Sequence, residues 1–404
     1  MDLKSGYPYW AIKNGLMYAF APVTQDVHCE VAVIGGGISG ALIANELGDH
    51  GFDVAVIEQR DIGWGSSAAS TALLQYEIDT PMTELCKRYG EDNAALAYTA
   101  CARAIDMLAE LAADVRDVGF CRAQSLYYAS RRFHVDGMRN EFALRQKHGF
   151  DVQWLSSADL ESDYGILSPG GILSQLAGRV DPYRMASRLL ARCRKRGAQV
   201  FDRSRIHGIK INSRTVTLRT DRDFSVHAKH VILAAGYANQ TWLRQKIARN
   251  RSSYAFITDP LDRETLGCLQ DTLVWESARP YLYLRSTRDA RLLGGGEDDA
   301  IDLPARRDAR VKRKAARLCK KVAKAMPRLQ QLEPAFAWAG TFAETGDGLP
   351  FFGPHPQYGR RVLFAMAYGG NGITYSMLGA GLLRALIKRR RHPLKALFSF
   401  DRLR

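Results

Sequence analysis

A glycine-rich turn between an apolar stretch and an amphipathic stretch constrains the fold of this chain more than any other feature. Residues 29–34 read CEVAVI and run into Gly35, and an amphipathic pattern starts at Ala41. This order predicts a strand, a tight turn and a helix. Gly35, Gly37 and Gly40 match the spacing G-x-G-x-x-G. In that spacing the glycines permit the turn, the approach of backbone N–H groups to a pyrophosphate, and close packing of the helix on the strand.

A second apolar stretch follows at 53–57, reads DVAVI and ends in Glu58. An acidic residue at this place accepts hydrogen bonds from a ribose hydroxyl, whereas it would repel a 2′-phosphate. The N-terminus of the helix adds a partial positive charge beside the phosphates. The sequence therefore predicts a βαβ unit that binds a dinucleotide, in preference to an empty structural turn, and it favours FAD or NAD over NADP.

Length and composition indicate a globular enzyme-sized protein. The chain has 404 residues, of which 46% are hydrophobic and 10% aromatic, enough for two domains with substantial cores. No apolar run approaches the ~20 residues that a spanning helix needs. Residues 1–28 lack the cleavage pattern of a signal peptide. We therefore expect a cytoplasmic location.

The cysteines and histidines indicate neither a disulfide framework nor a metal site. The cysteines are odd in number, widely spaced and without a C-x-x-C pair, and the histidines form no ligand-spaced cluster with them. Free buried thiols are expected instead. The residues concerned are Cys29, Cys86, Cys101, Cys121, Cys193, Cys268 and Cys319.

The formal net charge of +15 raises nucleic acid, an anionic membrane surface or an acidic substrate as partners. Much of the charge lies in helical-looking stretches at 306–324 and 384–391, where a solvated basic face is the simpler explanation. Nucleic-acid binding is therefore not favoured. Peripheral membrane contact stays open, because the basic end of the second stretch is followed by Leu394, Leu397, Phe398 and Phe400.

Other segments place further candidate elements around the dinucleotide unit. Helical patterns occupy 82–118 and 134–148, with a strand at 124–129 between them, and we assign these to a second domain. Asp181 is expected to cap a helix that begins at Pro182. An apolar strand runs into Gly236, and the sequence GGNGI at 369–373 precedes a helix, which predicts a second backbone-rich site.

The sequence leaves the role of two segments undecided, and each could either bind a ligand or be purely structural. The small-residue loop at 63–74 either brings hydroxyl and backbone groups to a ligand or simply caps a helix. Tyr281, Tyr283 and Arg285 alternate along a strand and so share one face. That face either lines a pocket for a small polar molecule or belongs to an amphipathic outer strand.

The order of these motifs resembles the FAD-dependent D-amino-acid oxidase family over nearly the whole chain, and it is nearest to the gamma-glutamylputrescine oxidase and glycine oxidase-like branch. The resemblance rests on several segments, not on the glycine turn alone. They are VIGGGISG, Glu58, Gly65-Ser66-Ser67, ILAAGYAN, RLLGGGE, WAGT, GDGLPFFG and YGGNGI.

This resemblance implies an α/β protein with a discontinuous Rossmann-like FAD-binding domain and a second α+β substrate domain built on a mixed or antiparallel sheet. The FAD-binding domain would comprise 1–81, 173–245 and 339–404, and the substrate domain 82–172 and 246–338. Sarcosine oxidases of the family attach flavin through a cysteine in the C-terminal region, but no cysteine follows Cys319. Non-covalent FAD is therefore expected.

The resemblance also implies which residues contact the FAD. They are Gly35, Gly37, Ile38, Ser39 and Gly40 in the turn, Glu58, Gln59 and Arg60 at the adenosine ribose, Ser66 and Ser67 near the pyrophosphate, Val180 and Ile206 on the adenine side, Ala235 and Gly236, and Gly370, Asn371, Gly372 and Ile373 near the pyrimidine edge.

The chemistry implied is hydride transfer from a carbon that bears an amine to the flavin, giving an imine that hydrolyses, with oxygen or another acceptor reoxidising the flavin. Phe342 stands where amino-acid-oxidising members carry an arginine that pairs with the substrate carboxylate. An amine substrate is therefore favoured, unless Arg279 or Arg285 replaces that arginine. The candidate pocket residues are Tyr281, Tyr283, Arg285 and Gln75, with Tyr76 nearby.

Two other functions remain open from the sequence. One is a dehydrogenase that passes electrons to a membrane quinone. The other is a flavoprotein that modifies tRNA, because one relative in the family acts on a modified uridine and this chain is basic. An even spread of basic residues over the folded surface, in place of a cluster near the flavin cleft, would weaken the tRNA-modifying function.

Overall fold

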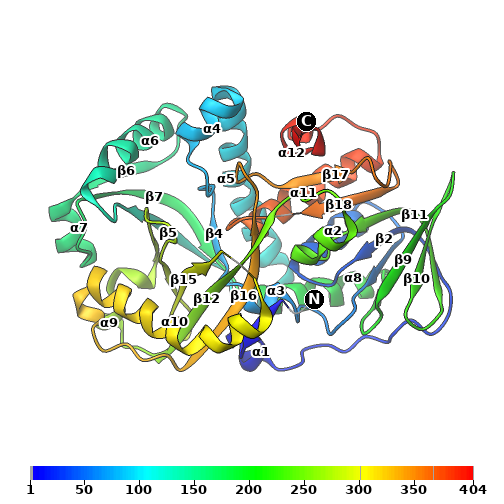
Figure 1. Cartoon of the computed structure of the whole chain (residues 1–404), viewed down its shortest axis with the longest axis horizontal. Coiled ribbons are helices and arrows are strands. Elements are labelled where there is room, and N and C mark those ends of the chain that lie inside the picture. Colours follow the sequence, from blue (N-terminus) through cyan, green and yellow to red (C-terminus); the bar gives the residue numbers. More distant parts are fainter. Residues whose placement is uncertain (1–2, 301, 367, 404) are drawn as a thin grey trace.

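The computed structural model describes residues 3–300, 302–366 and 368–403, which form two large β-sheets with helices packed around them (Figure 1). Each sheet takes strands from distant parts of the chain, so both halves of the molecule are discontinuous in sequence. The fold class predicted from the sequence, an α/β protein with a Rossmann-like part and a second part built on a mixed sheet, is confirmed.

The eight-stranded sheet carries the dinucleotide motif. Its core strands β18, β11, β2, β3 and β8 are parallel, and β17 adds to the edge in the antiparallel direction. The strands run in the order β17 (Phe351–Pro354), β18 (Val362–Met366), β11 (Ser225–Leu233), β2 (Val27–Ile34), β3 (Val54–Ile57) and β8 (Gln199–Phe201), and β11 also pairs with β10 (Val216–Thr220), which pairs with β9 (Ile206–Ile211).

Helices cover one face of this sheet and the β9–β10 hairpin covers part of the other. On the helical face, apolar side chains of the sheet and of α2, α5, α8 and α11 form one continuous core. A second core between the sheet and the hairpin includes Ala32, Ile34 and Leu218. The helices are α2 (Ile38–Asp49), α5 (Glu91–Val115), α8 (Pro182–Lys195) and α11 (Gly372–Ile387).

The glycine turn has a steric cause in the structure. The last four residues of β2 and all of β3 are buried, as expected for central parallel strands that are covered on both faces. Gly35 has a φ of +117°, a backbone conformation that side chains rarely adopt. A Cβ atom on Gly40 would lie 1.8 Å from the carbonyl oxygen of Gly35. Only glycine at position 40 therefore allows α2 to start this close to β2.

The ten-stranded sheet forms the other half of the molecule. It is mostly antiparallel, but β13 and β5 run parallel, so the sheet is mixed. Its order is β1 (Lys4–Gly6), β16 (Phe336–Glu344), β12 (Arg249–Pro260), β15 (Arg291–Asp299), β14 (Tyr283–Ser286), β13 (Thr272–Glu276), β5 (Cys121–Tyr128), β7 (Gly170–Arg179) and β4 (Leu73–Gln75), and β6 (Val152–Ser156) pairs with β7.

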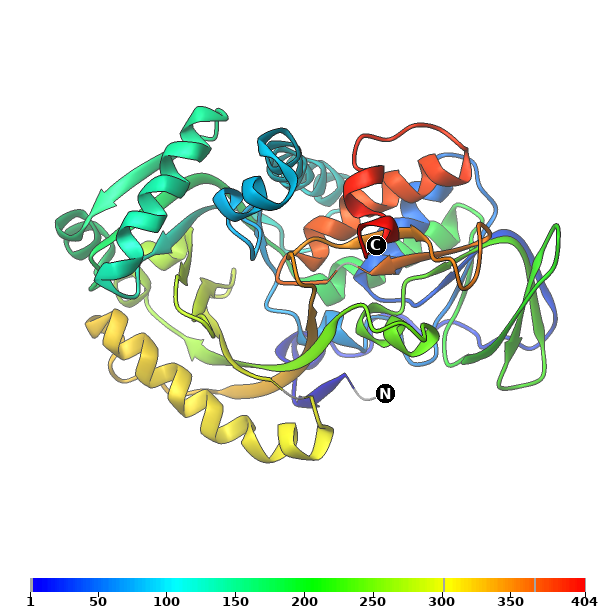
Figure 2. The same cartoon turned by 45° about the horizontal axis from the view of Figure 1, so that its top comes forward.

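The long helix α10 (Pro304–Ala325) lies along the outer side of this sheet, where Figure 2 shows it in yellow. Helices α6 (Val135–Lys147) and α7 (Ser157–Tyr164) lie at the far end. The remaining elements are short. They are α1 (Tyr9–Asn14), α3 (Ser66–Ala69), α4 (Met82–Tyr89), α9 (Arg263–Leu266) and α12 (Lys395–Phe398), with the 3-10 helices η1 (Arg132–His134), η2 (Gly236–Trp242), η3 (Gly267–Gln270), η4 (Pro327–Leu329) and η5 (Phe400–Leu403).

The domain boundaries stay a prediction, and two segments pack against elements that the sequence analysis placed in the other domain. The helical pattern at 82–118, assigned from sequence to the substrate domain, forms α4 and α5, and buried residues of both share the hydrophobic core of α2, α8 and α11. The N-terminal strand β1, assigned to the FAD-binding domain, pairs instead with β16 of the ten-stranded sheet. The predicted start of α8 is confirmed, because Asp181 accepts a hydrogen bond from the Arg184 N–H and Pro182 is the first helical residue.

The C-terminal segment does not present an apolar face to a bilayer. Leu394, Leu397, Phe398 and Phe400 are all buried within the molecule, so these apolar side chains are not available to a bilayer. Among the described residues, no helix has the length and apolar character needed to cross a membrane.

Candidate active site

A large cavity lies between the two sheets, at the carboxyl ends of β2, β3 and β11, which is where ligands bind in open parallel sheets. Its volume is about 410 Å³, within the range of ligand and cofactor sites. The lining comes from the β2–α2 turn, the end of β3, the segment 58–79, η2, the strands β12, β14, β15 and β16, and the start of α11. The cavity therefore has a dinucleotide end formed by the first sheet and a second end formed by the other.

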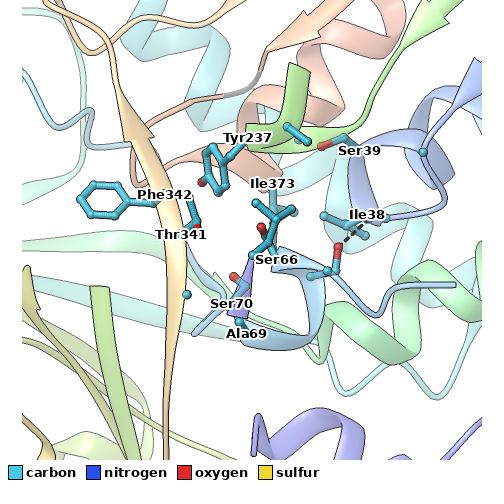
Figure 3. Close-up of a pocket in the computed structure, with 18 of the residues that line it drawn as sticks. Ile38, Ser39, Ser66, Ala69, Ser70, Tyr237, Thr341, Phe342 and Ile373 are labelled. Carbon is cyan, nitrogen blue, oxygen red and sulfur yellow. Dashed lines mark hydrogen bonds between the residues drawn. The ribbon is translucent and has the colours of Figure 1, made fainter. Parts of the chain in front are cut away.

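The N-terminus of α2 points its backbone at the dinucleotide end. Gly37 occupies the cap position and offers no side-chain acceptor to the first turn of the helix. The N–H of Ile38 donates to Ser67 Oγ at 2.8 Å, the dashed line in Figure 3. Ser39 Oγ lies 2.7 Å from Ser376 Oγ on α11, which ties the two helices together. The helix dipole and the uncapped N–H groups make this place favourable for an anion such as a pyrophosphate.

Glu58 lies at the end of β3 with its carboxylate held by backbone donors. Oε2 accepts from the N–H of Gly36 at 2.7 Å and Oε1 accepts from the N–H of Arg60 at 2.9 Å. Burial raises the pKa of Glu58 above its usual value, although both backbone hydrogen bonds oppose that shift. Each carboxylate oxygen accepts more than one hydrogen bond. The residue therefore keeps acceptor capacity toward the cavity.

Ser66 supplies a second polar group on the same side. Its hydroxyl is buried and has no hydrogen-bond partner among the described residues, and the residue lines the cavity. A buried hydroxyl without a partner is costly, so it indicates a ligand atom at this point. Figure 3 shows Ser66, Ala69 and Ser70 along one side of the cavity, with Tyr237 across from them.

The second end of the cavity is aromatic. Trp275, Tyr281 and Tyr283 line it, with ring centroids 6.5 Å apart for the first pair and 5.6 Å apart for the second. The indole N–H of Trp275 donates to Ser125 Oγ at 3.1 Å, and Gln75 Nε2 donates to the same oxygen at 3.0 Å. Such anchored rings form a rigid wall whose faces attract a cation.

Two carboxylates lie beside these rings. Asp79 Oδ1 accepts from the Tyr281 hydroxyl at 3.1 Å, and Asp79 Oδ2 accepts from the N–H of Gly370 at 2.6 Å. Asp298 lines the cavity with Oδ1 buried and unpartnered among the described residues. Burial raises the pKa of Asp298 to about 6, and the negative charges of Glu344 and Asp79 add to the shift. A carboxyl group with this pKa exchanges its proton near neutral pH.

Comparison with known proteins identifies the family. The sequence model of the FAD dependent oxidoreductase (DAO) family matches residues 30–386, most of the chain. The chain belongs to this family. Gamma-glutamylputrescine oxidoreductase of Escherichia coli is 24% identical over 390 residues, covering 94% of this chain and 88% of the relative. Glycine oxidase of Geobacillus kaustophilus is 26% identical over 377 residues, covering 89% and 93%. The crystal structure of glycine oxidase from Geobacillus kaustophilus matches with a TM-score of 0.78 at 21% identity, covering 92% of this chain and 98% of that one.

This DAO-family protein is therefore an FAD-dependent oxidoreductase, and its cavity fits the cofactor. The orphaned hydroxyl of Ser66 and the uncapped start of α2 suit the pyrophosphate, and the acceptors of Glu58 suit the ribose. The second backbone-rich site at the start of α11 borders the same cavity. These two sites suit a ligand longer than a mononucleotide.

Most residues that the sequence analysis assigned to FAD line this cavity, and their contacts with the cofactor stay predictions. Gly40 lies behind the turn, against Gly35, and does not line it. The assigned residues that do line it are Gly35, Gly37, Ile38, Ser39, Glu58, Gln59, Arg60, Ser66, Ser67, Ile206, Ala235, Gly236, Gly370, Asn371, Gly372 and Ile373.

Two assigned residues lie elsewhere. Arg285 is 1% exposed, and its guanidinium donates to the carbonyl oxygens of Ala72 and Val180 at 3.2 and 3.1 Å. Val180 and Arg285 border a different, smaller cavity. Arg285 does share the side of β14 with Tyr283, but the segment around Ala72 covers it. We therefore remove both residues from the candidate active site.

Some of the other candidate residues line the second end of the cavity, and others do not. Tyr281, Tyr283, Gln75 and Phe342 line the cavity. Arg279 is exposed; it donates to the Asp79 carbonyl and lies 4.6 Å from the Tyr281 ring centroid. Tyr76 is buried in the core beyond the cavity wall.

Sequence reasoning missed the acidic residues. Asp79 follows Gln75 and Glu77 at two-residue spacing, the alternation that continues a strand face into the cavity, and this signal was present in the sequence. Asp298 comes just after the RLLGGGE segment. Its position facing the cavity depends on the pairing of β15 with β12 and β14, which the local sequence does not reveal.

Proposed function

We propose that this enzyme oxidises a CH–NH group of a cationic amine that lacks an α-carboxylate. The observation that carries the proposal is the charge of the second end of the cavity. Asp79 and Asp298 border it, and so does Phe342, which the family resemblance places where an arginine pairs with a substrate carboxylate. Among the described residues that line the cavity, the cationic ones are Arg60 and Arg205, which belong to the dinucleotide end. An ammonium ion is favoured at the second end and a carboxylate is repelled.

The two relatives support the class of bond. Their names, gamma-glutamylputrescine oxidoreductase and glycine oxidase, both refer to compounds that carry nitrogen on carbon. Bound FAD would supply the chemistry by accepting a hydride from the carbon that bears the nitrogen. The residues of the chain would position the substrate, remove its extra proton and exclude water.

Asp298 is our candidate for the proton acceptor. An amine must be neutral before it loses a hydride, because a protonated nitrogen has no lone pair to stabilise the cation that forms. With a pKa of about 6, Asp298 is deprotonated above neutral pH and takes the proton from the substrate ammonium. Its unpartnered Oδ1 is the atom at which this proton would be held.

The rings and Asp79 would orient the substrate. Trp275 offers an aromatic ring to a cation, whereas Arg279 already lies over the ring of Tyr281, and the hydrogen bond from Tyr281 holds Asp79 in place. Phe342 adds apolar area and keeps carboxylate-bearing competitors from pairing there. Gln75 holds the Trp275 wall through their shared partner Ser125.

The basic residues give little support to a tRNA substrate. None of the residues of α10 borders the cavity, and Figure 2 shows that helix on the outer side of the ten-stranded sheet. Phosphate contacts for a nucleic acid would need cations around the mouth of the flavin cavity. The basic face of α10 is consistent with a solvated helix face.

Turnover assays would test the substrate class and the electron acceptor together. The FAD-loaded enzyme is supplied under air with primary amines, secondary amines, diamines and D-amino acids, and hydrogen peroxide and the carbonyl product are measured. The proposal expects products from amines without an α-carboxylate. Turnover confined to amino acids would overturn it. Peroxide release under air identifies oxygen as the acceptor, whereas turnover only with added quinone identifies a dehydrogenase.

A further inference from the structure

A second cavity lies apart from the flavin cavity, where α1, the start of α8 and the end of β14 meet. Its volume is about 70 Å³, several times what one water molecule requires. Five cationic side chains line it, against the carboxylates of Asp117 and Asp181. The excess of positive charge distinguishes it from the acidic end of the flavin cavity.

Arg285 is the most buried of these cations. It is 1% exposed, and two of its N–H groups donate to backbone carbonyls of Ala72 and Val180. Nε has no hydrogen-bond partner among the described residues. Burial lowers the pKa of Arg285 to about 9, and the charge of Arg179 contributes. The guanidinium is therefore still protonated at neutral pH, in a place where its charge is costly.

Arg179 adds a second buried charge next to the first. It comes from the end of β7, is 8% exposed, and donates to the hydroxyl and carbonyl of Ser286. Its Nε also lacks a partner within the described part of the chain. Neither Arg179 nor Arg285 has a carboxylate within 4.0 Å in residues 3–300, 302–366 and 368–403. Arg285 lies over the Trp10 ring, 5.0 Å from its centroid, and the charge of Asp181 acts on it, but neither contact is an ion pair. Two adjacent buried cations without a paired anion destabilise a fold unless something compensates them.

The two carboxylates of the cavity are already engaged. Asp181 caps α8 by accepting from the Arg184 N–H at 2.9 Å and accepts from Asn14 Nδ2 at 2.7 Å. Asp117 accepts from Arg184 Nη1 at 2.9 Å and from Arg188 Nη2 at 2.7 Å. Their hydrogen bonds therefore go to other groups and leave the inner arginines for a ligand.

We propose that this cavity binds a small monovalent anion, of the size of chloride, nitrate or formate, between Arg179 and Arg285. The two unpartnered Nε–H groups are the donors, and the ligand supplies a paired negative charge, since Asp181 acts on Arg285 without forming an ion pair with it. The volume admits an ion of this size. The anion would lie outside the flavin cavity and would contact neither the amine nor the flavin.

The anion would also influence the flavin cavity through Arg285. Arg285 holds the carbonyl oxygen of Ala72, and the segment from Ser70 to Leu73 borders the flavin cavity. Ala72 has a φ of +52°, so this segment is held in a conformation that needs support from its neighbours. An anion that fixes Arg285 stabilises that segment along with the whole fold.

Thermal unfolding of the FAD-loaded enzyme at constant ionic strength tests the proposal. Sodium gluconate, whose anion is too large for the cavity, is replaced stepwise by chloride, nitrate or formate. The proposal expects a saturable rise of the midpoint temperature of about 3 °C or more. An equal midpoint in gluconate and in all three small anions would overturn it.

A matched pair of variants locates the effect. Arg179→Gln removes one cavity cation and is expected to abolish most of the anion-dependent rise. Arg192→Gln removes a cation from α8 that pairs with Asp49 and Asp114 outside the cavity, and it should keep the rise. A full rise in Arg179→Gln contradicts the site. If that variant does not fold, the chloride NMR line width of the unmodified enzyme decides, because bound chloride must broaden the line and nitrate must reverse the broadening.

Discussion

The hydroxyl of Tyr281 donates a hydrogen bond to Asp79 Oδ1 at 3.1 Å, across 202 residues of sequence. Asp79 also accepts from the N–H of Gly370 at 2.6 Å, just before α11. The Asp79 carboxylate thus connects three segments: the residues just before β14, the segment after β4 and the start of α11. All three border the end of the flavin cavity where we place the substrate.

Removal of the Tyr281 hydroxyl tests this connection. Tyr281→Phe leaves Asp79 without one donor and is expected to raise the KM for the amine about 5-fold, since a hydrogen bond of this kind contributes on the order of 1 kcal/mol. The ring and the FAD content should be unchanged. Steady-state kinetics give the result, with Tyr89→Phe as the control, because the Tyr89 hydroxyl donates to Asp347 and neither residue lines the cavity. An unaltered KM in Tyr281→Phe would show that Asp79 is not oriented by this bond.

Asp298 is expected to control the pH dependence of activity. In the unmodified enzyme kcat/KM should rise with pH through an apparent pKa of about 6, as Asp298 loses its proton and becomes able to accept one. Asp298→Asn should lose this limb and about 100-fold of activity. Asp299→Asn serves as the control, because Asp299 does not line the cavity and pairs with Arg310, which does not line it either. The assignment fails if Asp298→Asn retains the same pH profile.

The same substitution has a predicted effect on stability. The folded state holds the proton on Asp298 up to a pKa of about 6, against an ordinary value of 3.8. The stability associated with that protonation is present below the ordinary pKa and is lost as the pH rises through 6, where a buried carboxylate must ionise. At pH 8 the free energy of unfolding of Asp298→Asn should therefore exceed that of the unmodified enzyme by up to about 2–3 kcal/mol, as measured by denaturant titration. At pH 4 the two values should differ little. A larger difference at pH 4 than at pH 8 contradicts this sign.

Phe342→Arg tests the preference against carboxylates. An arginine on β16 would offer a fork to a substrate carboxylate and repel the ammonium of an amine. The ratio of kcat/KM for glycine or a D-amino acid to that for an amine should increase about 10-fold or more. Phe342→Leu, which keeps an apolar side chain, is the control and should keep the amine preference. An unchanged ratio in a flavin-loaded Phe342→Arg enzyme would remove Phe342 from the account of specificity.

Glu58→Gln tests the dinucleotide end. Both oxygens of Glu58 accept backbone N–H groups, so an amide there turns one acceptor into a donor that faces another donor. We expect FAD to bind about 10-fold to 100-fold more weakly, at 1–3 kcal/mol for a lost buried hydrogen bond. Fluorescence titration of the FAD-free protein measures the change. Glu46→Gln, on the outer side of α2 where Glu46 pairs with Arg384, should leave the affinity unchanged.

Local signals made the dinucleotide end predictable from the sequence. The positive φ of Gly35 and the close approach of Gly40 to the carbonyl oxygen of Gly35 both arise within one turn, and Glu58 follows a short buried strand. Asp181 and Pro182 likewise mark the start of α8 by a local rule. Such features need no knowledge of distant parts of the chain.

The substrate end of the cavity could not be predicted from the sequence, because it is formed by contacts between distant segments. Strand alternation put Arg285 on the same side as Tyr283, but it gave no sign that the segment of Ala72 covers one residue and leaves the other open. The meeting of Tyr281 with Asp79 follows from the arrangement of two sheets. The apolar pattern of helix α5 shows that it is buried but does not show that it shares the core of α2, α8 and α11.

Anaerobic reduction of the bound flavin is the most direct test of the central claim, because it needs no assumption about the electron acceptor. The FAD-loaded enzyme is mixed with amines, diamines and D-amino acids in the absence of oxygen, and the visible flavin absorbance is followed. The account predicts that amines without an α-carboxylate bleach the flavin at a rate that increases with their concentration. Bleaching by D-amino acids alone, or a protein that takes up no FAD, would contradict it.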